Sequence, residues 1–94
     1  MAIELSKMRF SLGRIVITRN ALDSLSSDDV WEALKRHVNG DWGDVCEGDD
    51  ELNDDALISE GRLLSVYSDR SGTRFWIITE WDRSATTILL PEDY

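Results

Sequence analysis

The stretch from Thr73 to Trp81, TRFWIITEW, places the strongest limit on the fold. It is rich in β-branched and aromatic residues, and four apolar residues follow one another from Phe75 to Ile78. Successive side chains of a strand point to opposite faces, so this run is apolar on both faces, as in a central strand. We therefore expect helices to cover one face of the sheet, because both apolar faces cannot remain in water.

Two more strands flank this central one. Residues 62–68, RLLSVYS, and residues 85–90, ATTILL, have the same β-branched and apolar character. The turn at 69–72, DRSG, ends in a glycine that can adopt positive φ, and Asp82-Arg83-Ser84 forms the next turn. The sequence therefore predicts a three-stranded antiparallel meander over residues 62–90.

The N-terminal half reads as one strand followed by two helices. Residues 8–18, MRFSLGRIVIT, predict a strand with a bulge or bend at Gly13. Asn20 is a suitable N-cap for a short helix over residues 21–25. A longer helix is expected to begin at Ser26 or Ser27 and to end at Gly40. Its apolar stripe recurs every three or four residues at Val30, Trp31, Leu34 and Val38.

Between this helix and the meander lies a loop with a possible third helix. Trp42 is expected to fix the loop at 41–50 to the core, and residues 51–60 to form one or two helical turns. Leu52, Ala56 and Leu57 would face inward. The chain is thus predicted to be one α+β domain over residues 1–94, with residues 1–7 as a loose leader. The expected core comprises Leu34, Val38, Leu64, Val66, Phe75, Ile77, Ile88 and Leu90.

The charge balance excludes several kinds of partner. Nineteen acidic and ten basic residues give a net charge of −9. This balance disfavours direct binding to nucleic-acid backbones and to anionic membranes, since both depend on Lys and Arg. The one cysteine, Cys46, and the one histidine, His37, cannot complete a zinc site. No apolar run is long enough to span a bilayer, so we expect a cytoplasmic protein with no cofactor.

One stretch concentrates the negative charge. Eight acids fall between residues 41 and 55, with no Lys or Arg among them: Asp41, Asp44, Glu47, Asp49, Asp50, Glu51, Asp54 and Asp55. Such a row can imitate the phosphates of a nucleic acid and bind a basic protein groove. Alternatively, the acids are simply solvated. A divalent-cation site at 49–55 is a weaker alternative, because the D-x-D-x-D-G spacing of calcium loops is missing.

Two blocks of the chain resemble a known family. They are RHVNGDWGDV at 36–45 and GRLLSVYSDRSGTRFWIITEWDRSATTILLPEDY at 61–94. Together they are similar to short bacterial proteins of plasmids and other mobile elements, usually called plasmid-related proteins and sometimes labelled as type I restriction subunits. The matching positions are Arg36, His37, Gly40, Asp41, Trp42, Gly43, Asp82, Arg83, Ser84, Thr86, Thr87, Pro91 and Tyr94. The restriction label conflicts with this sequence, which lacks a glycine-rich cofactor-binding fingerprint.

The family resemblance implies a shape and a genomic context, but no agreed activity. In that context, the acidic stretch suggests an inhibitor of a host nucleic-acid-processing or defence system. An alternative is a compact metal-independent ribonuclease, because a helix carrying Arg36 and His37 before a sheet is similar to the layout of such toxins. His37 would then be the general acid or base, Arg36 and Arg83 would hold the phosphate, and Thr86 or Thr87 would position it. A homodimer formed through a sheet edge or face is also expected.

Overall fold

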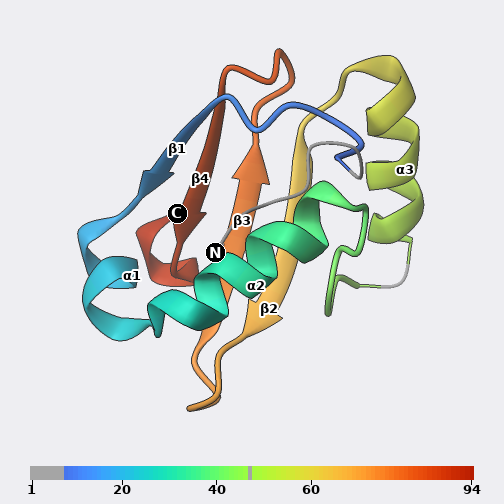
Figure 1. Cartoon of the computed structure of the whole chain (residues 1–94). Coiled ribbons are helices and arrows are strands. Elements are labelled where there is room, and N and C mark those ends of the chain that lie inside the picture. Colours follow the sequence, from blue (N-terminus) through green and yellow to red (C-terminus); the bar gives the residue numbers. More distant parts are fainter. Residues whose placement is uncertain (1–7, 47) are drawn as a thin grey trace.

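The computed structural model describes residues 8–46 and 48–94 and has the predicted α+β architecture (Figure 1). The expected leader, residues 1–7, lies outside the described residues. In chain order the elements are β1 (Arg14–Ile17), α1 (Arg19–Ser24), α2 (Ser27–Val38), α3 (Asp49–Ser59), β2 (Leu63–Ser68), β3 (Arg74–Thr79), β4 (Ala85–Leu89) and the 3₁₀ turn η2 (Pro91–Asp93). No helix in the described part of the chain is both long and apolar enough to cross a bilayer.

The four strands form one sheet in the order β1-β4-β3-β2. β2, β3 and β4 make the predicted antiparallel meander, with Ile77 of β3 between Ser65 of β2 and Ile88 of β4. No partner was predicted for the N-terminal strand; β1 pairs with β4 in parallel, which makes the sheet mixed. A strand pattern encodes which residues extend, but neither the partner nor the direction of pairing.

The N-terminal strand is also shorter than predicted, because the bend at Gly13 separates it from residues 8–12. Gly13 has φ +62°, and a Cβ there would lie 2.4 Å from the Arg83 carbonyl oxygen. Only glycine permits this close approach of the two backbones. Downstream, the hydroxyl of Thr18 rather than the side chain of Asn20 caps α1, accepting from the amide of Ala21 at 3.2 Å.

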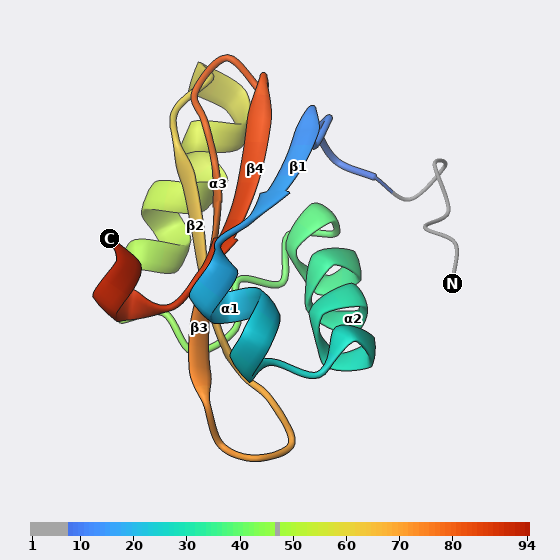
Figure 2. The same ribbon diagram turned by 90° about the vertical axis from the view of Figure 1, so that its left-hand side faces the viewer.

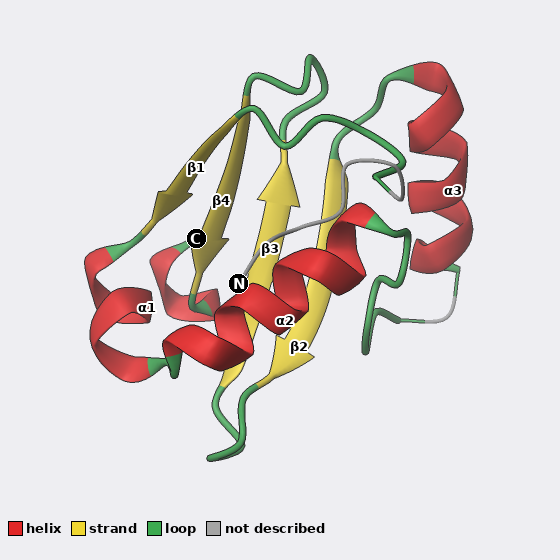
Figure 3. Cartoon of the chain, in the orientation of Figure 1, coloured by secondary structure: helices red, strands yellow, loops and turns green. Residues whose placement is uncertain are grey.

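Helices α1 and α2 lie over one face of the sheet, and α3 lies beyond the β2 edge (Figures 1 and 2). Figure 3 shows the same arrangement, with the strands between the helices. The main core forms where α2 meets β3 and β4, and Leu34, Val38, Phe75, Ile77 and Ile88 are all buried in it. A second, smaller cluster of Trp42, Ala56 and Leu63 joins α3 to the sheet.

Seven of the eight predicted core residues are buried, and Leu64 is the exception. Leu63 is fully buried on the helix-covered face, whereas Leu64 lies half-buried on the opposite face. The sequence carries two leucines in succession, so the alternation of β2 could be read in either phase. Trp31, which was assigned to the apolar stripe of α2, is exposed at its margin.

Candidate functional site

The acidic stretch follows the outer edge of β2. The loop first runs along this strand, where the amide of Val66 donates to the carbonyl of Trp42 at 3.0 Å and the amide of Asp44 donates to the carbonyl of Val66 at 2.7 Å. Gly43, between them, has φ +71°, and a Cβ there would meet the Val66 carbonyl oxygen at 2.0 Å. Only a glycine allows the loop to lie this close to the strand. The loop therefore has a fixed backbone position.

Asn53 of α3 closes the part of this edge at Leu64. Asn53 is buried on α3, and its side-chain amide donates to the Leu64 carbonyl at 2.7 Å. Its side-chain oxygen accepts from the Leu64 amide at 3.1 Å. The amide group thus replaces the backbone of a neighbouring strand and attaches α3 to β2.

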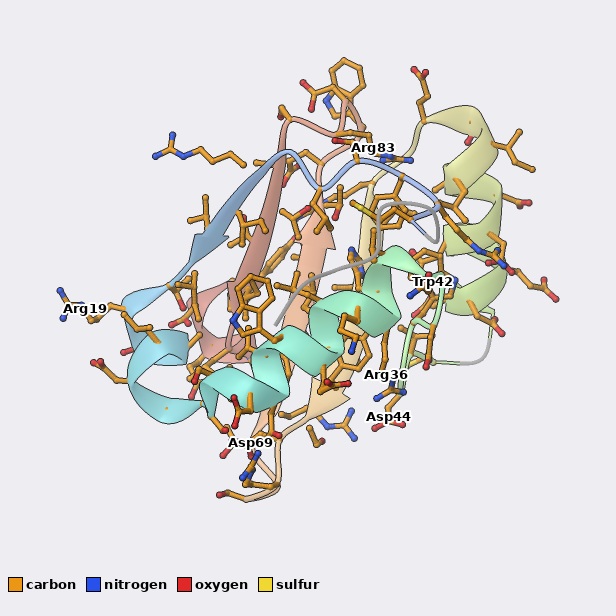
Figure 4. All side chains as sticks on the ribbon, viewed as in Figure 1. Arg19, Arg36, Trp42, Asp44, Asp69 and Arg83 are labelled. Carbon is orange, nitrogen blue, oxygen red and sulfur yellow. The ribbon has the colours of Figure 1, made fainter. Side chains whose placement is uncertain are left out.

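Trp42 fixes the loop as predicted. Its side chain is 4% exposed, and the ring stacks on Phe10 and contacts the ring of His37. Its indole N–H donates to the Asp54 carboxylate at 3.0 Å. Figure 4 shows Trp42 between the end of α2 and α3. A buried indole with its N–H paired is a rigid support for the loop.

Asp41 also belongs to this support: it is exposed, and its carboxylate is paired with Arg36. Its carboxylate accepts two hydrogen bonds from Arg36, at 2.8 and 3.2 Å, and the guanidinium stacks on the Tyr67 ring. These contacts lower the pKa of Asp41 and raise that of Arg36. The Tyr67 hydroxyl donates to the Asp41 carbonyl at 2.5 Å. Figure 4 places Asp44 beside Arg36.

The other predicted acids form an exposed surface on α3. Asp50, Glu51, Asp54 and Asp55 are exposed, and Asp49 is partly buried at the helix start. In residues 8–46 and 48–94, no Lys or Arg forms an ion pair with any of these five carboxylates. Asp49, Asp50 and Glu51 lie in the first turn of α3, where negative charge suits the helix dipole. Glu47, the remaining predicted acid, lies outside the described residues.

The outward face of α3 also carries an aliphatic residue that the sequence analysis missed. Ile58 is 88% exposed. Residues seven apart lie on one face of a helix, so Ile58 shares a face with Glu51, and Asp54 and Asp55 fall between them. Leu52, which was expected to face inward, is 66% exposed, because Asn53 takes the inward position. Four acids with an exposed Ile at one end define what we call the α3 surface: Asp50, Glu51, Asp54, Asp55 and Ile58.

A shallow polar pocket of about 330 Å³ separates the loop from the start of α3, and Asp41, Cys46, Asp50 and Asp54 are among its lining residues. Among the described residues, no three His, Cys, Asp or Glu side chains come close enough together to hold a metal ion.

His37 occupies a buried polar network rather than an open site. Its Nε2 lies 2.9 Å from the Thr79 hydroxyl, and its Nδ1 lies 2.5 Å from the Ser65 hydroxyl. The network continues through Thr86, whose hydroxyl lies 2.7 Å from that of Thr79 and donates to the Leu12 carbonyl at 2.7 Å. Burial first, and then the charge of Arg83, lowers the pKa of His37 to about 3.

The Leu12 carbonyl at the end of this network determines the direction of the hydrogen bonds from His37 through Thr79 to Thr86. A carbonyl only accepts, so the Thr86 hydroxyl donates to it and accepts from Thr79. Thr79 then accepts from Nε2–H of His37, and Nδ1 accepts from Ser65. The lowered pKa keeps the imidazole neutral, so its one ring proton is on Nε2. Its side chain is 0% exposed, so it cannot reach a substrate hydroxyl.

Arg83 also has a structural position. Its guanidinium donates to the carbonyls of Gly61 at 2.5 Å and of Ala56 at 2.9 Å, and to two carbonyls of its own turn. Ala56 lies in the last part of α3, so Arg83 anchors the C-terminal end of that helix (Figure 4). The backbone of Arg83 has φ +61°, an unusual conformation for a residue with a side chain.

The residues of the ribonuclease alternative are therefore not assembled into a phosphate site. His37 is enclosed, Arg36 is paired with Asp41, and Arg83 is bonded to main-chain carbonyls. Thr86 faces the buried network, whereas Thr87, one residue later, lies on the opposite face of the sheet.

A scan against protein-family models, a search of curated proteins and a search of solved structures found no match to this chain.

Proposed function

We propose that this chain is a small protein-binding module whose α3 surface binds a basic groove, of the kind that normally holds nucleic-acid phosphates. The observation that carries the proposal is the α3 surface itself: exposed carboxylates without a cationic partner in the described chain, next to an 88% exposed Ile58. A surface serving only solubility would gain as much from mixed, scattered charges as from carboxylates gathered on one helix.

The charge density suits a phosphate-binding groove. Glu51 and Asp55 are one turn apart, about 5–6 Å along the helix face; Asp54 lies between them in sequence and Asp50 directly before them. Duplex DNA carries about one charge per 1.7 Å of axis, so two turns of this helix offer a comparable row. Target lysines and arginines would meet the carboxylates, and the aliphatic side chain of Ile58 would enter an apolar part of the groove.

The supporting contacts favour binding by a preformed surface. Asn53 joins α3 to β2, Arg83 holds its C-terminal end, and the Trp42 indole is bonded to Asp54 at its N-terminal half. A surface held at three points loses little conformational entropy on binding. By the resemblance described above, the target would be a host nucleic-acid-processing or defence protein, and the chain would act as an inhibitor that occupies its nucleic-acid groove.

The test is capture from bacterial lysate with immobilised protein in three forms. The wild type is compared with Glu51→Lys/Asp55→Lys on the α3 surface and with Asp23→Lys/Glu92→Lys, which makes the same charge change at exposed sites elsewhere. We expect the wild type and the Asp23/Glu92 control to capture the same protein, and the α3 variant to lose it. Added duplex DNA or RNA should release the captured protein, and so should raised salt.

Two results would contradict the proposal. One is equal capture by the two charge-reversed variants, which would show that the α3 surface is not the contact. The other is capture that added nucleic acid does not prevent, which would show that the captured protein does not bind through a phosphate groove. Ile58→Ser should weaken capture without changing its salt dependence, because it removes apolar contact and no charge.

A further inference from the structure

The other edge of the sheet, β1, has open backbone groups. The amides of Arg14 and Thr18 donate to Ser84 and Ile88 of the β4 side, at 3.0 Å each. In a parallel pair, alternate residues bond to the neighbouring strand, so Ile15 and Ile17 direct their N–H and C=O groups outward. Within residues 8–46 and 48–94, no group bonds to these four outward atoms. Unpaired edges of this kind are templates for another strand.

An apolar groove of about 220 Å³ lies next to this edge, between β1, α1 and α2. Its wall includes Ile15, Leu22 and Trp31, which are 46%, 59% and 39% exposed. Val16, on the other face of the strand, is also exposed. The edge therefore combines open hydrogen-bonding groups with apolar side chains on both faces, whereas monomeric proteins usually protect such an edge with charge, proline or a covering segment.

We propose that β1 pairs with β1 of a second copy of this chain, antiparallel about a two-fold axis at Val16. In this register Ile15 of each copy lies opposite Ile17 of the other, and their outward N–H and C=O groups form four hydrogen bonds. This register gives every outward N–H and C=O group of both β1 strands a hydrogen-bond partner. Ile faces Ile and Val faces Val, so the contact is apolar and self-complementary, as a two-fold interface requires.

The same register places opposite charges together. Residues 14 and 18 lie opposite one another across the axis, so Arg14 faces Thr18 of the second copy. The Thr18 hydroxyl is bonded to the Asp93 carboxylate at 2.7 Å, and Asn20 donates to the same carboxylate at 2.7 Å. These bonds lower the pKa of Asp93, which keeps it ionised. Each Arg14 would thus meet a fixed carboxylate, once at each end of the interface.

This charge match favours a second copy over an unrelated apolar peptide. The surface of Arg14, Val16 and Thr18 beside Asp93 is complementary to itself under the two-fold rotation. The half-buried apolar cleft of about 300 Å³ on the open sheet face, which includes Trp76 and Ile78, offers no such match. The proposal concerns a surface at the opposite edge from α3 and does not depend on the proposed function.

Cysteine cross-linking tests the register directly. Cys46 is exposed and free, so the variants are made with Cys46→Ser. Val16→Cys brings two thiols together at the axis, where Cα atoms of a non-hydrogen-bonded pair are about 4.5 Å apart, within disulfide range. Arg14→Cys is the control for register, because its two copies would be about 13 Å apart; it is oxidised at a concentration where light scattering still shows a dimer. We expect mild oxidation to link Val16→Cys into a dimer and to leave Arg14→Cys unlinked.

Light scattering supplies the second test. The wild type should have twice the 10.7 kDa chain mass. Ile15→Pro removes an outward N–H without removing a bond to β4, and two lost hydrogen bonds should raise the dimer Kd about tenfold or more. Arg14→Asp should weaken the dimer as well and does not depend on how the strand tolerates proline. Three results would overturn the proposal. The wild type could be monomeric, or both cysteine variants could link equally. The third is a dimer that Ile15→Pro and Arg14→Asp leave unchanged but that Trp76→Asp disrupts.

Discussion

Acidification from pH 7 to pH 5 should destabilise this protein through His37 alone. Burial lowers the pKa of His37 from 6.5 to about 3 in the folded chain. Between these values the unfolded chain binds one more proton than the folded chain, so the stabilisation is fully present above pH 6.5 and is lost as the pH falls toward 3. His37 is the only histidine, and no other side chain with a normal pKa titrates in this interval.

The expected loss is about 2 kcal/mol at pH 5. This figure depends chiefly on the unfolded pKa, because a folded pKa anywhere below about 4 gives nearly the same result at pH 5. Carboxylates contribute little in this range. Those with lowered pKa, such as Asp41 and Asp93, start from an ordinary value of 3.8, so their contribution is lost only in more acidic solution. A loss of about 2 kcal/mol is a large part of the stability of a small domain.

Urea denaturation followed by tryptophan fluorescence at pH 5, 6 and 7 and constant ionic strength measures this loss. His37→Gln is the matched variant. It is less stable than the wild type at pH 7, because the network is interrupted, but its stability should not change between pH 7 and pH 5. The reasoning is refuted if the wild type is equally stable at both pH values, or if the variant keeps the same slope. Nitrogen NMR should also show the His37 proton on Nε2 throughout this range.

Two further predictions concern the attachment of α3. Arg83→Lys replaces the two guanidinium nitrogens that bond to Ala56 and Gly61 by one ammonium, so it should lower the free energy of unfolding, measured in urea, by about 1–3 kcal/mol and accelerate amide exchange in the last turn of α3. Arg19→Lys, at an exposed position, should have no effect, and an equal effect of both variants would contradict the anchoring role of Arg83. Asn53→Ala should lower the free energy of unfolding by about 1–3 kcal/mol, because it leaves the Leu64 amide and carbonyl without partners. The Leu64 amide should also exchange faster, and unchanged exchange there would contradict the role of Asn53 at this edge.

The strands of the meander could be predicted because their signal is local. Phe75 to Ile78 is apolar without interruption, and the 69–72 turn carries its own chemistry. The Asp69 carboxylate accepts from the amides of Ser71 and Thr73 at 2.9 Å, and Gly72 has φ +83°. Such features form wherever these residues stand in this order. The third helix was predicted from the same kind of pattern. Ala56 and Leu57 face inward as predicted, and only Leu52 was assigned to the inward face incorrectly.

What the sequence could not reveal depends on contacts between distant residues. Asn53 looks like a surface residue until Leu64 is placed beside it, 11 positions away. His37 looks catalytic until Ser65 and Thr79 surround it. Arg83 looks like a phosphate ligand until the end of α3 reaches its guanidinium. Polar residues of these types serve equally well in sites and in structural networks, so only the three-dimensional arrangement separates the two roles.

The two edges of the sheet differ in whether their outward backbone groups are hydrogen-bonded, and this difference connects the two proposals. At β2, the outward groups of Leu64 and Val66 are bonded by the Asn53 amide and by the loop at 42–44. The chain thus closes this edge with the same contacts that hold the α3 surface rigid. At β1, Ile15 and Ile17 remain open in the described chain. Pairing there would leave the α3 surfaces at the two outer ends of a continuous eight-stranded sheet. Because the two surfaces share no residue, loss of one interaction does not require loss of the other.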